Sequence, residues 1–349
     1  MKKLFLYGIL ILSCLLLNGV SKSLLAQNFN NAGEYLDYLS TEFTKISTNT
    51  WNYTSVASHG KKTKKVDSLR NVLIANVSDE IKKIESMPKY NENARLRDSL
   101  VSYLKLNNNV LKQDYAKIAD LEEISGQSYD LMIAYLKAQD IVDIKLEHAS
   151  EMFEMQQQVF ANKYKINFID NGNKISKKLK DAHIVYNYYN MVYLIFFKSF
   201  IQESYMLDAL SKIDSTGIEQ NRVALLKNSK DGLSKIDTVK DFRGDASLKN
   251  AANQSIKFFN EEAEVKIPIL TDFLSKKENF QKLKSAYYAK PESKRTDKEK
   301  EDLDKALGDV NQALNKYYTT NQEINKERYN QSENWNKTVS DFLLKYLPK

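Results

Sequence analysis

Cysteine is almost absent from this chain, because Cys14 is the only one among 349 residues. It lies inside an apolar run close to the N-terminus, at residues 4–17. A chain cleaved after that run has no cysteine, which excludes disulfides, a thiol nucleophile and a thiolate metal site. The mature chain must then be stabilised by its core alone, which a length of about 320 residues allows.

Glycine and proline are also scarce, with ten and four residues. β-Sandwiches and α/β folds need many more turn residues, so the low counts favour long helices. The three histidines are His59, His148 and His183. A di-iron bundle needs Glu-x-x-His twice, but a lysine stands three residues before His148 and another three before His183. We therefore predict no metal site and no cofactor.

Motifs of enzyme active sites are missing as well. The chain contains no Gly-x-Ser-x-Gly, no His-Glu-x-x-His and no Walker loop. We predict that the protein is not an enzyme and has no catalytic residue. An enzyme with a carboxylate-based site stays open as an alternative, because any helix surface can supply a carboxylate pair.

One run of acids shares a predicted helix face. It consists of Asp140, Asp143, Glu147, Glu151 and Glu154. Five carboxylates could chelate Ca²⁺, but their spacing matches no EF-hand loop. Acids at three- and four-residue steps are typical of a solvated or salt-bridged helix face, which is the interpretation we favour.

The N-terminal segment carries the clearest functional signal. Two lysines at positions 2 and 3 precede the apolar run, and Ala26 is a small residue after it. This pattern predicts a secretory signal peptide over residues 1–26, cleaved between Ala26 and Gln27. The protein is therefore predicted to be exported, to the periplasm or the cell surface.

The same segment allows a second interpretation. Residues 11–14, Ile-Leu-Ser-Cys, resemble a lipobox, in which Cys14 would carry a lipid and anchor an outer-membrane lipoprotein. Both forms of export stay open, and contact with a membrane is predicted only through this lipid.

The formal net charge of +7 does not indicate a nucleic-acid partner. Removal of three lysines with the signal lowers the charge to about +4. Binding to nucleic acid needs basic residues clustered on one face, whereas here acids and bases are nearly balanced.

Apolar residues recur at helical spacing over much of the chain. Steps of three and four residues place them on one face of an amphipathic helix. Four such lines are Val66, Leu69, Leu73, Val77, Ile81 and Ile84; Leu96, Leu100, Leu104, Leu111, Ile118 and Leu121; Tyr129, Leu136, Ile141, Leu146, Phe153 and Phe160; and Leu303, Leu307, Val310, Leu314, Tyr317 and Ile324.

Capping and breaking residues divide these lines into helices. Residues 31–34, 216–219 and 296–299 each place a capping side chain three residues before a glutamate. We expect breaks at Pro88, Asn171-Gly172-Asn173 and Pro291, and a kink or split at Pro268.

These signals together predict an all-α protein, an elongated antiparallel bundle of about seven to nine helices. Residues 27–349 are predicted to form a single helical domain. Its N-terminal half covers about 30–168 and its C-terminal half about 174–347.

Residues 182–201 have the length of a membrane span but a different composition. His183, Asn187, Asn190 and Lys198 interrupt the segment, and each would be costly at membrane depth. We interpret it as a central helix buried in the bundle. The alternative is an inserting segment of a helical pore-forming toxin-like protein.

Several segments resemble a known family. They are Gln157–Tyr164, Tyr186–Lys198, Phe200–Glu203 and Trp335-Asn336. The chain is similar to a family of uncharacterised, exported, all-helical bacterial surface proteins of the spirochaete type, also found in other Gram-negative groups. The resemblance implies an envelope or surface location and no catalytic site. We therefore expect a non-enzymatic protein that binds or scaffolds an unknown envelope protein or surface ligand.

Overall fold

The computed structural model describes residues 29–58, 63–167 and 173–348. Several predictions concern residues outside these ranges, namely the signal segment with Cys14, Ala26 and Gln27, most of the Asn-Gly-Asn loop, and His59. Within the described ranges the secondary structure is helical, with two isolated β-bridges and no strand. The prediction of an all-α fold is confirmed.

The chain order of the helices is as follows. They are α1 (Ala32–Ser58), α2 (Thr63–Glu85), α3 (Arg95–Asn109), the π-helical turn η1 (Val110–Asp114), α4 (Tyr115–Ser125), α5 (Tyr129–Lys163), α6 (Asn173–Ser211), α7 (Ser215–Thr238), α8 (Ser247–Glu261), the π-helical turn η2 (Glu262–Lys266), α9 (Ile267–Tyr288), the 3₁₀ turn η3 (Glu292–Lys294) and α10 (Asp297–Tyr346). Because η1 and η2 join their neighbours without a break, the described residues form eight continuous helical rods, as predicted.

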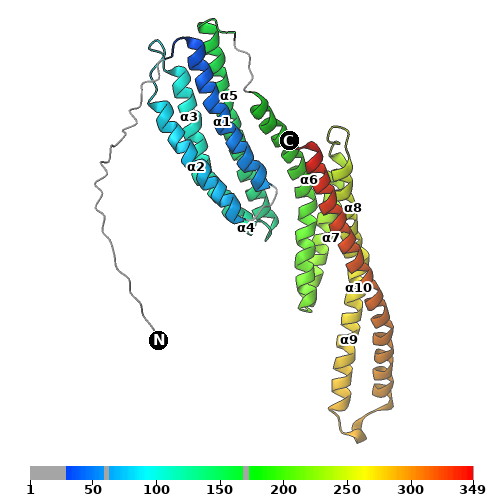
Figure 1. Ribbon diagram of the computed structural model, residues 1–349. Helices are drawn as coiled ribbons and strands as arrows, with labels where there is room; N and C mark the ends of the chain where they lie inside the picture. The colour runs from blue at the N-terminus through cyan, green and yellow to red at the C-terminus, as the bar shows by residue number, and fades with distance from the viewer. Residues whose placement is uncertain (1–28, 59–62, 168–172, 349) are drawn as a thin grey trace, which may run out of the picture.

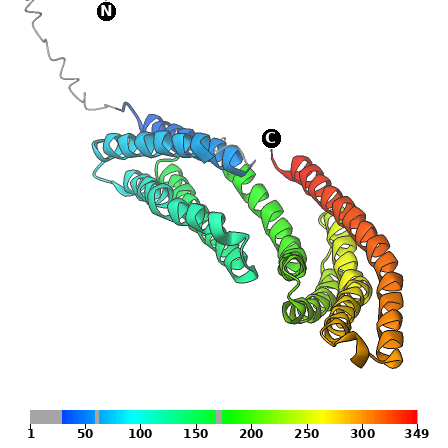
Figure 2. The same cartoon turned by 90° about the horizontal axis from the view of Figure 1, so that it is seen from below.

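The bundle is elongated. In Figure 1, helices α1–α5 lie side by side at one end of the molecule and α6–α10 at the other. Figure 2 shows the two groups following one another along an arc. Each group has its own large hydrophobic cluster, one formed by α1, α2, α3 and α5, the other mainly by α6–α10. The single domain proposed for residues 27–349 stays a prediction.

The two groups repeat one architecture. A 15-residue helix followed by a five-residue π-helical turn occurs as α3–η1 and again as α8–η2, and 152 residues separate Arg95 from Ser247 at their starts. The same spacing relates the start of α2 to that of α7. We call α1–α5 the first unit and α6–α10 the second unit.

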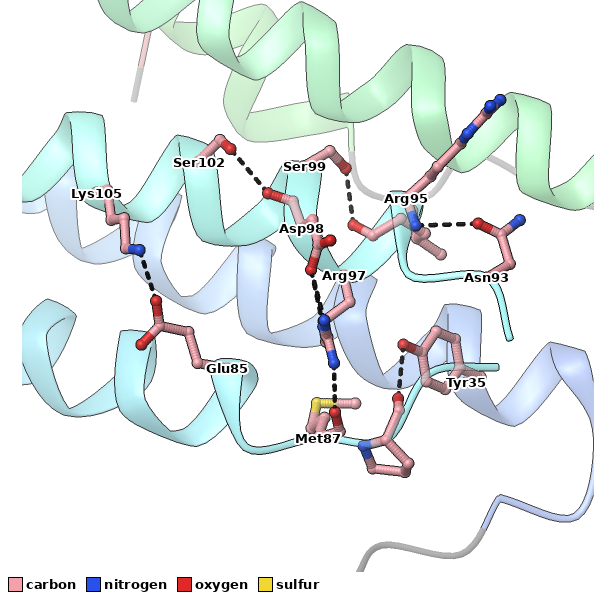
Figure 3. A network of polar contacts seen from close by, with 12 residues as sticks. Tyr35, Glu85, Met87, Asn93, Arg95, Arg97, Asp98, Ser99, Ser102 and Lys105 are labelled. Atoms are coloured by element: carbon pink, nitrogen blue, oxygen red, sulfur yellow. Dashed lines mark hydrogen bonds and ion pairs between the residues drawn. The ribbon is translucent and has the colours of Figure 1, made fainter. Parts of the chain in front are cut away.

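The connections before α3 and α8 confirm this correspondence. Arg97 donates from Nη1 to the carbonyl oxygen of Met87 at 2.8 Å, as Figure 3 shows. Lys249, 152 residues later, donates to the carbonyl oxygen of Val239 at 3.2 Å. The β-bridges Tyr90–Asn93 and Phe242–Asp245 show the same relation.

Matching clusters of four aromatic rings close one end of each unit. The first is Tyr35, Tyr90, Phe160 and Tyr164, and the second is Tyr188, Phe242, Phe342 and Tyr346. The centroids of Tyr35 and Phe160 are 5.7 Å apart with the rings at 29°, and those of Tyr188 and Phe342 are 5.7 Å apart at 30°. Residues of α5 and α10 therefore correspond at a spacing of 182.

The units differ in the length of their last two rods. Helices α9 and α10 have 22 and 50 residues, whereas α4 and α5 have 11 and 35. Aligned on the first unit, the second carries an extension at residues 275–310, which we call the arm. In Figure 1 it projects beyond the rest of the molecule.

Most capping predictions hold, and one is wrong. Asn31 caps α1 and Thr296 forms a capping box with Glu299 at the start of α10. Thr216 does not cap α7, because Asp214 accepts from the Gly217 N–H at 3.0 Å instead. A carboxylate is favoured there because it also interacts with the positive end of the helix dipole.

Proline positions also sharpen the predicted boundaries. Pro88 and Pro291 lie in connections between helices, as predicted. Of the kink or split predicted at Pro268, the split is wrong, because the rod continues from α8 through η2 into α9. Pro268 lies in the first turn of α9, directly after the π-helical turn, where the local change in hydrogen bonding accommodates a missing N–H.

Two predicted apolar lines include residues that face solvent. Ile141 of α5 is exposed while its neighbour Val142 is buried. On α10, Leu307 is exposed, and the small residues Ala306 and Ala313 are buried. Hydrophobicity alone ranks alanine below leucine, but a close helix–helix contact favours the smaller side chain.

Candidate functional site

Residues 182–201 lie in α6, where one face belongs to the second core. Val185, Val192 and Phe197 are buried, whereas Ile184 and Met191 face solvent. The segment thus lies within the bundle, as predicted. Among the described residues, no helix combines the length and the apolar character that crossing a membrane requires.

The acidic face of α5 meets this helix. Lys180 donates from Nζ to Glu151 Oε1 at 2.8 Å, and Glu147 Oε1 is 3.8 Å away. His183 lies 3.6 Å from Asp143 and 3.9 Å from Asp140. The interpretation of a salt-bridged face is confirmed for Glu147 and Glu151, which pair with Lys180. Asp140 and Asp143 form ion pairs with His183 when its imidazole is protonated.

These contacts shift the protonation of both basic groups. The hydrogen bond to Glu151 raises the pKa of Lys180. The Asp143 carboxylate raises the pKa of His183, against an opposing effect of burial. In the part of the chain that is described, no group of three or more metal-ligating side chains is arranged to hold an ion.

A cavity of about 70 Å³ lies beside these ion pairs, where the first unit meets α6. Aromatic and polar side chains surround it, among them Thr50, Trp51, Tyr103, Tyr115, Glu147 and Tyr186. Pockets for substrates of drug-like size usually measure about 300–1,000 Å³. This cavity has room only for waters or a very small solute. The carboxylate-based enzyme stays a prediction.

Two positions that line the cavity carry charged residues in the second unit. A spacing of 153 relates Tyr35 of α1 to Tyr188 of α6, so Thr50 corresponds to Glu203. At the spacing of 182, Leu146 corresponds to Arg328. There the two charged side chains belong to one buried cluster. Arg328 donates from Nε to Glu203 at 2.6 Å and from Nη2 to Glu262 at 2.5 Å.

This buried triad joins three elements. Glu203 belongs to α6, Glu262 to the π-helical turn η2 and Arg328 to α10. Glu203 and Glu262 are 3% and 0% exposed. Burial, together with the neighbouring Glu203 carboxylate, raises the pKa of Glu262 to about 8. One guanidinium facing two carboxylates leaves an excess negative charge in a medium of low dielectric, which favours a proton on one acid.

Sequence reasoning missed the triad. Its members are 66 and 125 residues apart along the chain, and each lies in an ordinary helical pattern. The alignment of the two units, which rests on the structure, places these charged residues at the positions of Thr50, Val110 and Leu146.

We compared the chain with protein-family models, curated proteins and solved structures, and none of the three comparisons found a match. The resemblance to exported surface proteins therefore stays a prediction.

Proposed function

We propose that this protein is exported and acts as a non-enzymatic binding or scaffolding protein at the cell envelope or surface, contacting its partner through the arm. The observation that carries the proposal is the arm itself. It is present in the second unit and has no counterpart in the first, where residues 126–128 join α4 to α5 directly.

The arm is a free-standing helical hairpin. Helix α9 packs on α10 and adjoins η2. Of the other helices of the second unit, α8 makes most of the contacts with α10. Leu303 and Ala306 are buried in its seam. A hairpin that contributes this little to the core is available for contacts outside the molecule.

The tip of the arm is ordered by its own side chains. Arg295 lies 5.2 Å from the ring centroids of both Tyr287 and Tyr288. Lys290 pairs with Glu299, which also closes the capping box of α10. Tyr288 is nevertheless 58% exposed. Tyrosine and arginine on a rigid projection are the residue types that dominate binding energy at protein interfaces.

A variant copied from the first unit tests the proposal. Residues 275–310 are replaced by the connection at residues 123–128, and both proteins are used for pull-down from envelope extracts. We expect the native protein to retain a specific envelope protein that the shortened variant loses. The triple variant Tyr287→Ala, Tyr288→Ala, Arg295→Ala keeps the arm and should lose most of the same partner.

Two controls make the result decisive. The fluorescence of Trp335, buried in the second core, should be unchanged in a shortened variant that folds correctly. Capture of the same partner by the shortened variant would rule out the arm as the contact, and a native protein that elutes alone would rule out the binding function.

The pore-forming alternative has its own test. A protein that inserts residues 182–201 into a bilayer releases dye from liposomes. If purified protein releases none over a range of lipid compositions, the pore-forming alternative is wrong.

A further inference from the structure

A line of apolar side chains on α5 faces solvent. Its members are Ile141, Ile144, Met152, Met155 and Val159, which are between 45% and 52% exposed. They follow one another at steps of three and four residues, with His148 in the single gap. The line is therefore straight, one helix wide and about 27 Å long at 1.5 Å per residue. We call it the α5 stripe.

The fold of the unit does not require this stripe. At a spacing of 182 its five residues correspond in α10 to Glu323, Lys326, Asn334, Lys337 and Asp341, which are all polar. On the buried sides of the two helices the residues match instead, since Phe153 corresponds to Trp335 and Phe160 to Phe342, and all four are buried. The second unit thus folds with a polar face on α10 at these positions. The apolar character of the same face of α5 in the first unit therefore indicates a contact outside the chain.

The two edges of the stripe carry opposite charges. On the side of α6 lie Asp140, Glu147 and Glu151, with side chains 43%, 35% and 50% exposed. Lys180 pairs with Glu147 and Glu151, so this edge has three acids for one lysine and keeps an excess of negative charge. On the other side lies Lys145, whose Nζ is 3.1 Å from Asp114 at the end of η1. Lys163 follows Lys145 by five full turns and shares its edge.

We propose that a second copy of this chain covers the α5 stripe, with the two α5 helices parallel about a two-fold axis that runs along them. Parallel pairing places the acidic edge of each helix opposite the basic edge of the other, on both sides of the contact. Antiparallel pairing places acid opposite acid. A membrane surface is disfavoured as the occupant, because anionic lipid would meet the carboxylates of the acidic edge.

The size of the stripe sets the expected strength. A contact one helix wide buries less than the roughly 800 Å² per partner of a standard interface. We therefore expect a reversible dimer with a dissociation constant on the order of micromolar.

Analytical ultracentrifugation over a micromolar concentration series tests the dimer. The variant Ile144→Lys, Met155→Lys introduces the lysines that the second unit has at these positions, and it should weaken the dimer by about tenfold or more. The matched control Lys326→Ala, Lys337→Ala alters the equivalent face of α10 and should dimerise like the native protein. A native protein that stays monomeric, or a lysine variant that dimerises equally well, would overturn the proposal.

Cross-linking tests the orientation. In a Cys14→Ser background, parallel pairing brings position 152 against its own copy, so Met152→Cys should form an intermolecular disulfide on mild oxidation. Antiparallel pairing centred on the stripe brings position 152 against position 148. Disulfides that form only in a mixture of Met152→Cys and His148→Cys chains would overturn the parallel arrangement. The arm takes no part in either test, so these results are independent of the proposed function.

Discussion

In the second unit a single guanidinium holds two buried carboxylates. Arg328 reaches Glu203 and Glu262 from a third helix, and both acids are removed from solvent. Such a network stabilises only while it is complete, because a lone buried charge is far more costly than a buried pair. The first unit folds without it, with Thr50, Val110 and Leu146 at the same positions.

Removing the guanidinium alone should be strongly destabilising. We expect Arg328→Leu to lower the free energy of unfolding by about 3–5 kcal/mol, since it leaves two acids unpaired. The triple variant Glu203→Thr, Glu262→Val, Arg328→Leu carries the residues of the first unit and should recover most of that loss. Urea unfolding followed by Trp335 fluorescence in a Trp51→Phe background measures both. A single variant as stable as the native protein would contradict the prediction.

The triad also predicts a pH dependence. Because the pKa of Glu262 is raised from 4.5 to about 8 on folding, the folded chain binds more protons than the unfolded chain between these values. The free energy of unfolding should therefore fall as the pH rises through this window. Glu262→Gln, which is neutral throughout, should show a shallower fall by the same Trp335 measurement. Equal slopes in the two proteins would show that Glu262 ionises normally.

At the scale of single helices, the ends are set by local side-chain chemistry. Three sequence motifs suggested capping, and in two of them the cap and the glutamate interact as expected. In the third, Glu219 is held by Arg222 at 2.6 Å, and the cap moves to Asp214. A motif four residues long therefore predicts that a helix begins nearby, but competing side chains decide where.

The helix α7 offers a direct comparison of two candidate caps. Asp214→Ala should lower the free energy of unfolding by about 1 kcal/mol, because one N–H at the helix start loses its acceptor. Thr216→Ala lies inside the first turn and should change it by less than about 0.5 kcal/mol. Thermal unfolding by circular dichroism distinguishes them, and a larger effect at Thr216 would reverse the assignment.

At the scale of the whole molecule, two copies of one helical unit have been adapted differently. The first unit has an apolar stripe and a small cavity, while the second has a polar face, a buried triad and the arm. Differences between units of a shared architecture mark what the architecture itself does not need. For this reason both proposals rest on features that only one unit has.

Export remains the whole-molecule property that the sequence predicts most directly. We expect mass spectrometry of the native protein to give an N-terminus at Gln27 after cleavage behind Ala26, in a fraction free of membrane. A chain that begins at Cys14 with an attached lipid, recovered with the outer membrane, would instead establish the lipoprotein form. Recovery of the chain from the cytosol with Met1 still present would contradict both forms of export.

The sequence by itself determined the helices and their approximate number, because helical periodicity and the scarcity of glycine and proline act over a few residues. It also indicated that the acids of α5 form ion pairs. It did not distinguish Ile141, which faces solvent, from Phe153 on the same helix, which is buried. Both residues fit the same apolar spacing, and a local sequence pattern does not indicate whether a helix face packs against another helix or faces solvent.

Tertiary structure decided the rest. Phe160 and Phe342 each begin the short sequence Phe-x-x-Lys-Tyr, which by itself is too brief to show a repeat, and the matching four-ring clusters establish that they are equivalent. The triad depends on side chains up to 125 residues apart in the chain. Packing of the folded chain determines which distant helices are in contact. The candidate sites are therefore formed by residues that no local sequence pattern distinguishes.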